Sequence, residues 1–219
     1  MRAWNSGCRS RWTRSSRSAL RLRRSGICTT PTRRSGCGWA TASLGEALFA
    51  LQERRCTLAI SSVEIPDPRI EREALWFVPR AAVAAASHPL AVRAACGGPI
   101  IAVELADHIQ IVGEDPSPLT EGRDFGVLSP GTWRVSDNAI KHALILAGIG
   151  WGSLPLWLIQ RDLAEGRLVR VPAAEFGPQG ETVVRSYLMH RVDEPLGPAA
   201  NTFCQALFRH SEQQPATFA

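Results

Sequence analysis

The sequence has little lysine and lacks the short motifs of common enzymes and metal sites. Lys141 is the single lysine among 25 basic residues, which we interpret as the codon usage of a GC-rich genome. The motifs G-x-S-x-G, H-E-x-x-H and C-x-x-C are all absent, and the five histidines have no ligand-like spacing. We therefore predict that the protein is not an enzyme, holds no metal and needs no cofactor.

The chain also lacks a long uninterrupted apolar segment. Its longest apolar run, residues 143–159, is broken by three glycines and by Pro155, so it predicts a buried helix and a buried strand rather than a membrane span. The N-terminus has no apolar core of a signal peptide, and the six cysteines are scattered. Scattered cysteines suit a reducing compartment, and we predict a cytoplasmic protein without membrane contact.

Acidic residues are absent before Glu46, and this absence changes how the net charge is interpreted. Residues 1–37 contain ten arginines, whereas the rest of the chain holds 15 basic and 20 acidic residues. The basic pI of about 9.2 is therefore a property of an N-terminal tail. Because its Arg/Ser-rich composition offers little apolar surface to bury, we predict that this tail is disordered. A tail that binds DNA phosphates and an organellar transit peptide stay open as alternatives.

Beyond the tail, segments with strand and helix patterns alternate, which predicts an α/β architecture with mostly parallel strands. Ser136 or Asp137 is placed to cap the second of the predicted helices. The predicted helices are residues 43–51, 138–147, 156–164 and 198–209, and the predicted strands are 57–60, 76–85, 108–112, 133–135, 151–154, 167–171 and 183–190.

The glycines at 148, 150 and 152 are spaced as in a dinucleotide-binding loop. A phosphate-binding loop follows a strand and opens a helix, whereas this segment follows a predicted helix and enters a predicted strand. We therefore interpret the glycines as positions where the backbone packs closely in a tight turn.

Several segments, in this order and spacing, resemble one known family. They read CTLAI at 56–60, RIEREAL at 69–75, AASHPL at 85–90, TWRVSDN at 132–138, GIGWGSLP at 148–155, AEGRLV at 164–169 and PAANTFCQAL at 198–207. Together they resemble the effector-binding domain of LysR-type transcriptional regulators, from about residue 43 to residue 207.

The resemblance implies two Rossmann-like α/β lobes joined by crossover strands, similar to type 2 periplasmic binding proteins. It places the domain at 38–219, with lobe I at 38–75 plus 184–209 and lobe II at 76–183. It also implies a small-molecule effector in the cleft between the lobes, and a homodimer or homotetramer that uses the helix at 44–51.

In the family, DNA is bound only through a winged helix-turn-helix, and nothing in residues 1–40 resembles one. A stand-alone solute-binding protein and an inactive fragment are therefore kept as alternative functions. If residues 30–39 are encoded by GC-rich codons, shifting the reading frame by two nucleotides gives an amino-acid sequence close to a strand of the family. We hypothesise that residues 1–37 are translated out of frame; genomic DNA without a regulator in any upstream frame would refute this.

Ligands of open α/β sheets bind beyond the carboxyl ends of the strands, which selects seven candidate contact residues. They are Ser61, Ser62, Asp115, Ser117, Arg134, Ser136 and Asp137. A helix N-terminus at this edge favours an anionic effector, although the negative charge of Asp137 opposes a carboxylate at that spot. The alternative roles of these residues are caps, loop hydrogen bonds and, for Arg134, a structural ion pair.

Overall fold

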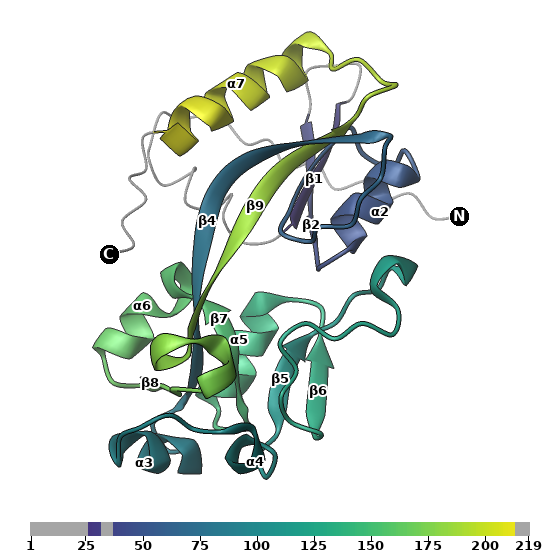
Figure 1. The fold of residues 1–219 in the computed structure, drawn as a ribbon. Coiled ribbons are helices and arrows are strands. Elements are labelled where there is room, and N and C mark those ends of the chain that lie inside the picture. Colours follow the sequence, from purple (N-terminus) through teal and green to yellow (C-terminus); the bar gives the residue numbers. More distant parts are fainter. Residues whose placement is uncertain (1–25, 32–36, 213–219) are drawn as a thin grey trace.

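Two long strands, β4 (Ile70–Ala85) and β9 (Glu181–Arg191), run through both halves of the molecule and connect them (Figure 1). They pair antiparallel along most of their length, and their register shifts between Ala74 and Phe77. These are the crossover strands of a two-lobed α/β fold. The structure is a computed structural model, and it describes residues 26–31 and 37–212.

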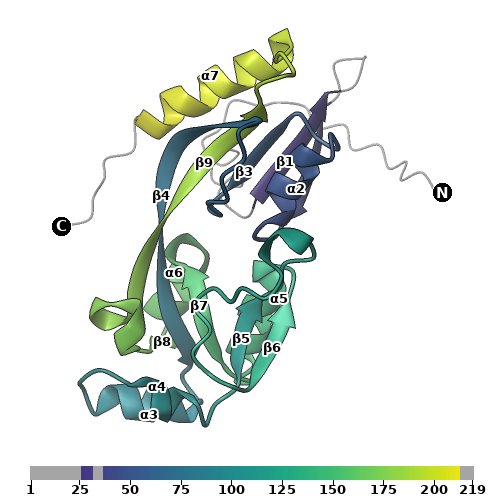
Figure 2. The ribbon, with the colours of Figure 1, turned by 45° about the vertical axis from the view of Figure 1, so that its right-hand side comes forward.

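Lobe I consists of the N-terminal strands, the C-terminal helix and the adjoining halves of β4 and β9. Its sheet has the order β2-β1-β3-β9-β4. Helix α2 covers one face of this sheet and helix α7 the other (Figure 2). The elements are β1 (Gly26–Pro31), β2 (Cys37–Ala42), α2 (Glu46–Gln52), β3 (Leu58–Ser61) and α7 (Pro198–Glu212).

Lobe II is built on the other halves of β4 and β9. Its strands are β5 (Gln110–Gly113), β6 (Thr132–Val135), β7 (Trp151–Pro155) and β8 (Leu168–Arg170). Its helices are α3 (Pro89–Ala95), α4 (Ala102–Leu105), α5 (Asn138–Leu146) and α6 (Leu156–Ala164). Helix α3 was not predicted, although His88 caps it and a proline stands at its first position, which is a common helix start.

The expectation of mostly parallel strands is wrong. Only β5 pairs parallel, with β6 and with β7, whereas the other strand pairs of the described residues are antiparallel. The physical reason is that β4 and β9 run in opposite directions through the centre of the sheet. Strand β3 pairs antiparallel with β9, and β7 and β8 pair antiparallel with β4. The alternation of helices and strands in the sequence does not reveal which strands will pair.

Part of the predicted tail also differs from the prediction. Gly26–Pro31 forms strand β1 and Cys37 begins strand β2, so these residues belong to the edge of the lobe I sheet. Backbone hydrogen bonding along an edge needs no apolar periodicity, which is why composition missed it. The remainder of the predicted tail lies outside the described residues.

The core of lobe II shows why β4 can be covered on both sides. Ala81 and Val83 face the cluster under α5 and α6, while Ala82 and Ala84 face the cluster under α3 and α4. All four side chains are fully buried. Alternate side chains of a strand point to opposite faces, so a continuous apolar run buries both faces of this strand.

Three observations bear on compartment and metals. Within residues 26–31 and 37–212, no helix is long and apolar enough to cross a membrane, and no cluster of three His, Cys, Asp or Glu side chains could hold a metal ion. Cys96 and Cys204 are free thiols, but Cys56 is disulfide-bonded. The expectation of reduced cysteines therefore does not hold at Cys56.

The glycines at the start of β7 pack the backbone closely, as predicted. A Cβ on Gly150 would overlap the carbonyl oxygen of Ile109. A Cβ on Gly152 would lie 2.5 Å from the carbonyl oxygen of Ile111 and 2.9 Å from Cε of Lys141. Both positions thus hold β7 against β5, and Gly152 also brings α5 close to the sheet.

We expect Gly150→Ala to lower the free energy of unfolding by about 2–3 kcal/mol, because the overlap is with backbone that cannot move aside. Gly131→Ala is the matched control in the same lobe, since nothing lies within 4 Å of its Cβ position. The control should stay within about 1 kcal/mol of the wild type. Urea denaturation measures both, and equal stabilities of the two variants would contradict the close-packing argument.

Candidate ligand-binding cleft

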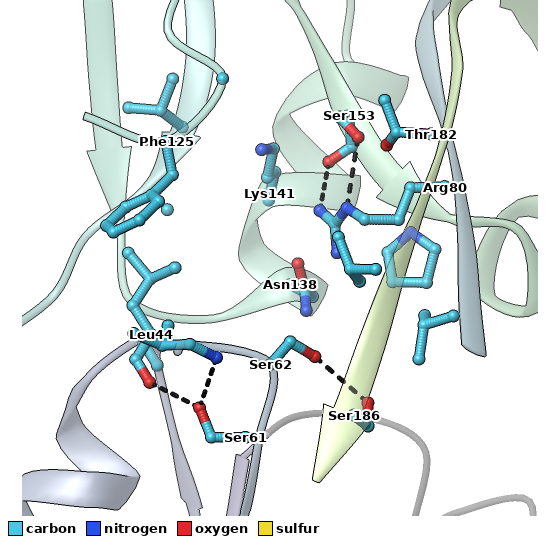
Figure 3. A pocket seen from close by; sticks show the side chains of 18 of the residues that line it. Leu44, Ser61, Ser62, Arg80, Phe125, Asn138, Lys141, Ser153, Thr182 and Ser186 are labelled. Atoms are coloured by element: carbon cyan, nitrogen blue, oxygen red, sulfur yellow. Dashed lines mark hydrogen bonds between the residues drawn. The ribbon is translucent and has the colours of Figure 1, made fainter. Parts of the chain in front are cut away.

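A cleft of about 650 Å³ lies between the two lobes, and both contribute to its walls. From lobe I come residues of the loops that follow β2 and β3. From lobe II come the ends of β5, β6 and β7 and the start of α5. The crossover strands supply a further wall, formed by Trp76, Val78 and Arg80 of β4 and by Thr182, Val184 and Ser186 of β9. Figure 3 shows several of these side chains converging on the cleft.

Four of the seven predicted contact residues line this cleft: Ser61, Ser62, Ser136 and Asp137. The Ser61 hydroxyl donates to the carbonyl oxygen of Leu44 at 3.1 Å and accepts from the Val63 N–H. The hydroxyl groups of Ser62, which follows β3, and Ser186 of β9 form a hydrogen bond of 3.1 Å. Much of the hydroxyl surface on the lobe I side is therefore engaged within the protein.

Asp137 caps helix α5, as predicted. Its carboxylate accepts from the Ala139 N–H at 2.5 Å and from the Ile140 N–H at 3.4 Å. The backbone carbonyl of the adjacent Ser136 accepts a short hydrogen bond from Ser43 of lobe I. This segment therefore combines a helix cap with a contact between the lobes.

The other three predicted residues, Asp115, Ser117 and Arg134, lie beside a neighbouring cavity of about 610 Å³. The Asp115 carboxylate accepts from the Gly45 N–H at 2.9 Å, which joins lobe II to lobe I. Ser117 caps a short 3₁₀ turn, and Arg134 forms an ion pair with Asp124 at 2.7 Å. The structure thus gives each of the three a structural partner, and their contact with a ligand remains a prediction.

Sequence reasoning missed the two cationic side chains at the lobe II end of the cleft. Arg80 extends from β4, and its guanidinium donates to the Ser153 hydroxyl at 3.2 Å and to the Ser153 carbonyl at 2.8 Å (Figure 3). Burial lowers the pKa of Arg80 to about 10, so the group stays charged at neutral pH.

Lys141 lies on α5 and is only 6% exposed. No hydrogen bond or ion pair of its ammonium group is found among residues 26–31 and 37–212. Burial, together with a smaller effect of the nearby Arg80 charge, lowers the pKa of Lys141 to about 7. A signal for this residue was present in the sequence: Lys141 and Ile145 are four residues apart, so the lysine shares the buried face of its helix.

The acidic side chains that line the cleft, Glu64 and Asp137, do not pair with these cations. Glu64 accepts a hydrogen bond of 2.8 Å from the Tyr187 hydroxyl, and Asp137 is engaged at the start of α5. The described part of the cleft therefore has a cationic end whose charge is not balanced by protein carboxylates. Such an end can hold an anion, because a bound anion would offset the cost of the buried charge.

Comparison with known proteins gives one family. The profile of the LysR substrate-binding domain matches residues 39–212. No curated protein matches the chain.

Solved structures of LysR-family domains have the same fold. The regulatory domain of CcmR from Synechocystis PCC6803, solved in complex with 2-PG, is 21% identical with a TM-score of 0.59, covering 80% of this chain and 84% of that one. The effector-binding domain of QuiR in complex with shikimate is 20% identical with a TM-score of 0.57, covering 77% and 78%. The regulatory domain of MetR from N. meningitidis is 18% identical with a TM-score of 0.56, covering 77% and 79%.

The buried ammonium group generates a pH-dependent prediction. The pKa of Lys141 is about 7 in the folded protein and about 10.5 when exposed, so between these values the unfolded chain binds more protons. Stability of the ligand-free protein therefore rises with pH in this window. The charged side chain that acts on Lys141 is that of Arg80 from β4.

We expect Lys141→Met to be more stable than the wild type by about 2 kcal/mol or more at pH 7, with the difference shrinking towards pH 9. Methionine replaces the ammonium group by an apolar end of similar length. Urea denaturation at several pH values measures the difference. A difference independent of pH, or a less stable variant, would contradict the buried, unpaired state of this lysine.

Proposed function

The chain belongs to the family of LysR substrate-binding domains. We propose that its interlobe cleft binds a small anionic effector, and that this binding controls transcription through the DNA-binding part of a regulator. The observation that carries this proposal is the cleft itself, which has walls from both lobes and a cationic end without protein counter-charges. A molecule that contacts both walls stabilises one relative arrangement of the lobes over others.

The connection between the lobes is suited to such a movement. Apart from β4 and β9, the lobes are joined at the cleft rim by the hydrogen bonds from Ser43 to Ser136 and from Gly45 to Asp115, and Leu119 of lobe II packs against the core of lobe I. The register shift between Ala74 and Phe77 interrupts the crossover pairing. A few rim contacts and one irregular strand pair can be rearranged at modest cost, so a ligand in the cleft can shift the population between open and closed lobes.

The domain acts by binding alone in this proposal. Carried over from the family, it works in the cytoplasm as a homodimer or homotetramer, and DNA is bound through a winged helix-turn-helix. The family match supports a regulator over a stand-alone solute-binding protein. An inactive fragment is the remaining alternative, and it predicts that no small molecule binds.

Thr182 and Val183 provide a matched test of the cleft. Thr182 lines the cleft, while Val183, the next residue of β9, is 48% exposed and does not line it. In a differential scanning fluorimetry screen of small metabolites, we expect at least one to raise the melting temperature of the wild type. Thr182→Trp should abolish that shift by filling the cleft, and Val183→Trp should retain it. A shift that survives in Thr182→Trp would place the ligand elsewhere.

Helix α2 tests the proposed dimer. Its apolar residues Ala47, Leu48, Ala50 and Leu51 are buried in the core of lobe I, which leaves Phe49 as the half-buried apolar side chain on its outer side. We expect a dimer at tens of micromolar in sedimentation velocity and a shift towards monomer in Phe49→Glu, because a charge in an apolar interface is costly. A monomeric wild type would contradict the proposal, and Glu53→Gln, at the exposed residue that ends the same helix, is the charge control.

A further inference from the structure

We propose that the ligand of this cleft is a small carboxylate with an apolar body, the carboxylate held by Lys141 and Arg80 and the body lying against Trp76, Val78 and Phe125. This inference rests on the proposed function and names the chemical class of its ligand.

The burial of Lys141 without a partner is the first feature that points to an anionic ligand. The residue is only 6% exposed, yet it borders the cleft, and its ammonium group has no partner among the described residues. An unpaired buried charge is strongly unfavourable, and a purely structural position would be filled by an apolar residue at lower cost. The cost is offset when an anion enters the cleft, because the ion pair then forms in a site from which water is largely excluded.

The fixed orientation of the Arg80 guanidinium points to a carboxylate. The Nε and Nη2 groups donate to Ser153, which fixes the plane of the guanidinium at the same end of the cleft as Lys141 (Figure 3). The Nη1 group has no hydrogen-bond partner in the described part of the chain. A guanidinium held in this way presents its remaining donors in a fixed direction, which suits the two oxygens of a carboxylate.

Several polar side chains elsewhere in the cleft already have hydrogen-bond partners within the protein. The hydroxyl groups of Ser61, Ser62 and Ser186 are bound to protein atoms. The Gln110 side chain donates to the Gly126 carbonyl and accepts from the N–H groups of Leu128 and Ser129. Hydroxyl groups of a ligand would therefore find few free partners at these four side chains, whereas an apolar body would bury the faces of Trp76, Val78 and Phe125. Ser136, Asn138 and Thr182 also line the cleft and have no side-chain hydrogen bond among the described residues, so they can accept or donate to a few polar atoms of the ligand.

The acidic residues of the cleft limit the ligand to a single charged group. Glu64 and Asp137 line the same cleft, where Glu64 accepts a hydrogen bond from the Tyr187 hydroxyl and Asp137 accepts one from the Ala139 N–H. A second carboxylate on the ligand would meet these negative charges, so a monocarboxylate is favoured over a dicarboxylate.

Calorimetry with paired probes tests the charge requirement. The probes are acetate, hexanoate and benzoate, each compared with its neutral primary amide, and inorganic phosphate and sulfate serve as oxyanions without an apolar body. We expect hexanoate or benzoate to bind about tenfold or more tightly than its amide, because a neutral group leaves the buried charges unpaired. We expect acetate, phosphate and sulfate to bind more weakly than that carboxylate.

Variants test the two cations separately. Lys141→Met and Arg80→Leu should each weaken the carboxylate by about tenfold or more, while Lys141→Arg and Arg80→Lys, which keep the charge, should lose less. Arg161→Leu is the matched control, since Arg161 lies on α6, pairs with Glu165 and does not line the cleft. Circular dichroism of each variant establishes that it is folded before binding is measured.

The single lysine provides a direct readout. Protein labelled with [¹³C]lysine has one side-chain Cε signal, from Lys141. We expect this signal to move on addition of the carboxylate and not of its amide, with an upward shift of its apparent pKa in the complex.

The outcomes that overturn this inference are distinct from failure of the proposed function. An amide that binds as tightly as its carboxylate, with both lost in Thr182→Trp, would leave a ligand-binding cleft but remove the carboxylate site. Phosphate that binds as tightly as benzoate would remove the apolar body. If neither the probes nor the metabolite screen gives any binding, both the inference and the proposed function are wrong.

Discussion

The antiparallel pairing of β4 with β9 is the interaction on which the rest of the structure depends. Both strands belong to both lobes, so each lobe completes its sheet with one half of the same strand pair. The cleft lies beside this pair, and alternate residues of the two strands form one of its walls. A single strand pair thus builds two cores, separates them and lines the space between them.

The same strand pair explains how binding could be converted into movement. Backbone pairing holds the lobes at a fixed separation along the strands, while the register shift beyond Ala74 relaxes the pairing where the lobes meet. At the rim, Leu119 of lobe II packs against the core of lobe I, and the polar bridges from Ser43 and Gly45 are individual hydrogen bonds. Each contributes about 0.5–1.5 kcal/mol, or somewhat more to a carboxylate, which is within the range that a bound metabolite can offset.

The cationic end of the cleft shows a conflict between stability and binding. Lys141 occupies the buried face of α5, where an apolar side chain would stabilise the fold. Gly152 makes room for the lysine, because a Cβ at this position of β7 would lie only 2.9 Å from Cε of Lys141. A side chain that is unfavourable for folding but faces a cleft is best explained by an interaction that the ligand-free protein does not contain.

The amino-acid sequence by itself determined the alternation of elements, a helix cap at Ser136 or Asp137, the close packing at Gly150 and Gly152, and the family to which the chain belongs. These follow from local propensities and from motifs a few residues long, which act wherever the chain is placed. Only the tertiary structure decided that most strands pair antiparallel, that Gly26–Pro31 completes an edge of lobe I, and that Asp115 holds the lobes together beside a separate cavity. It also brought Arg80 and Lys141, 61 positions apart, to one end of the cleft. Strand partners and the burial of a charge are set by contacts between distant segments, and no local pattern contains them.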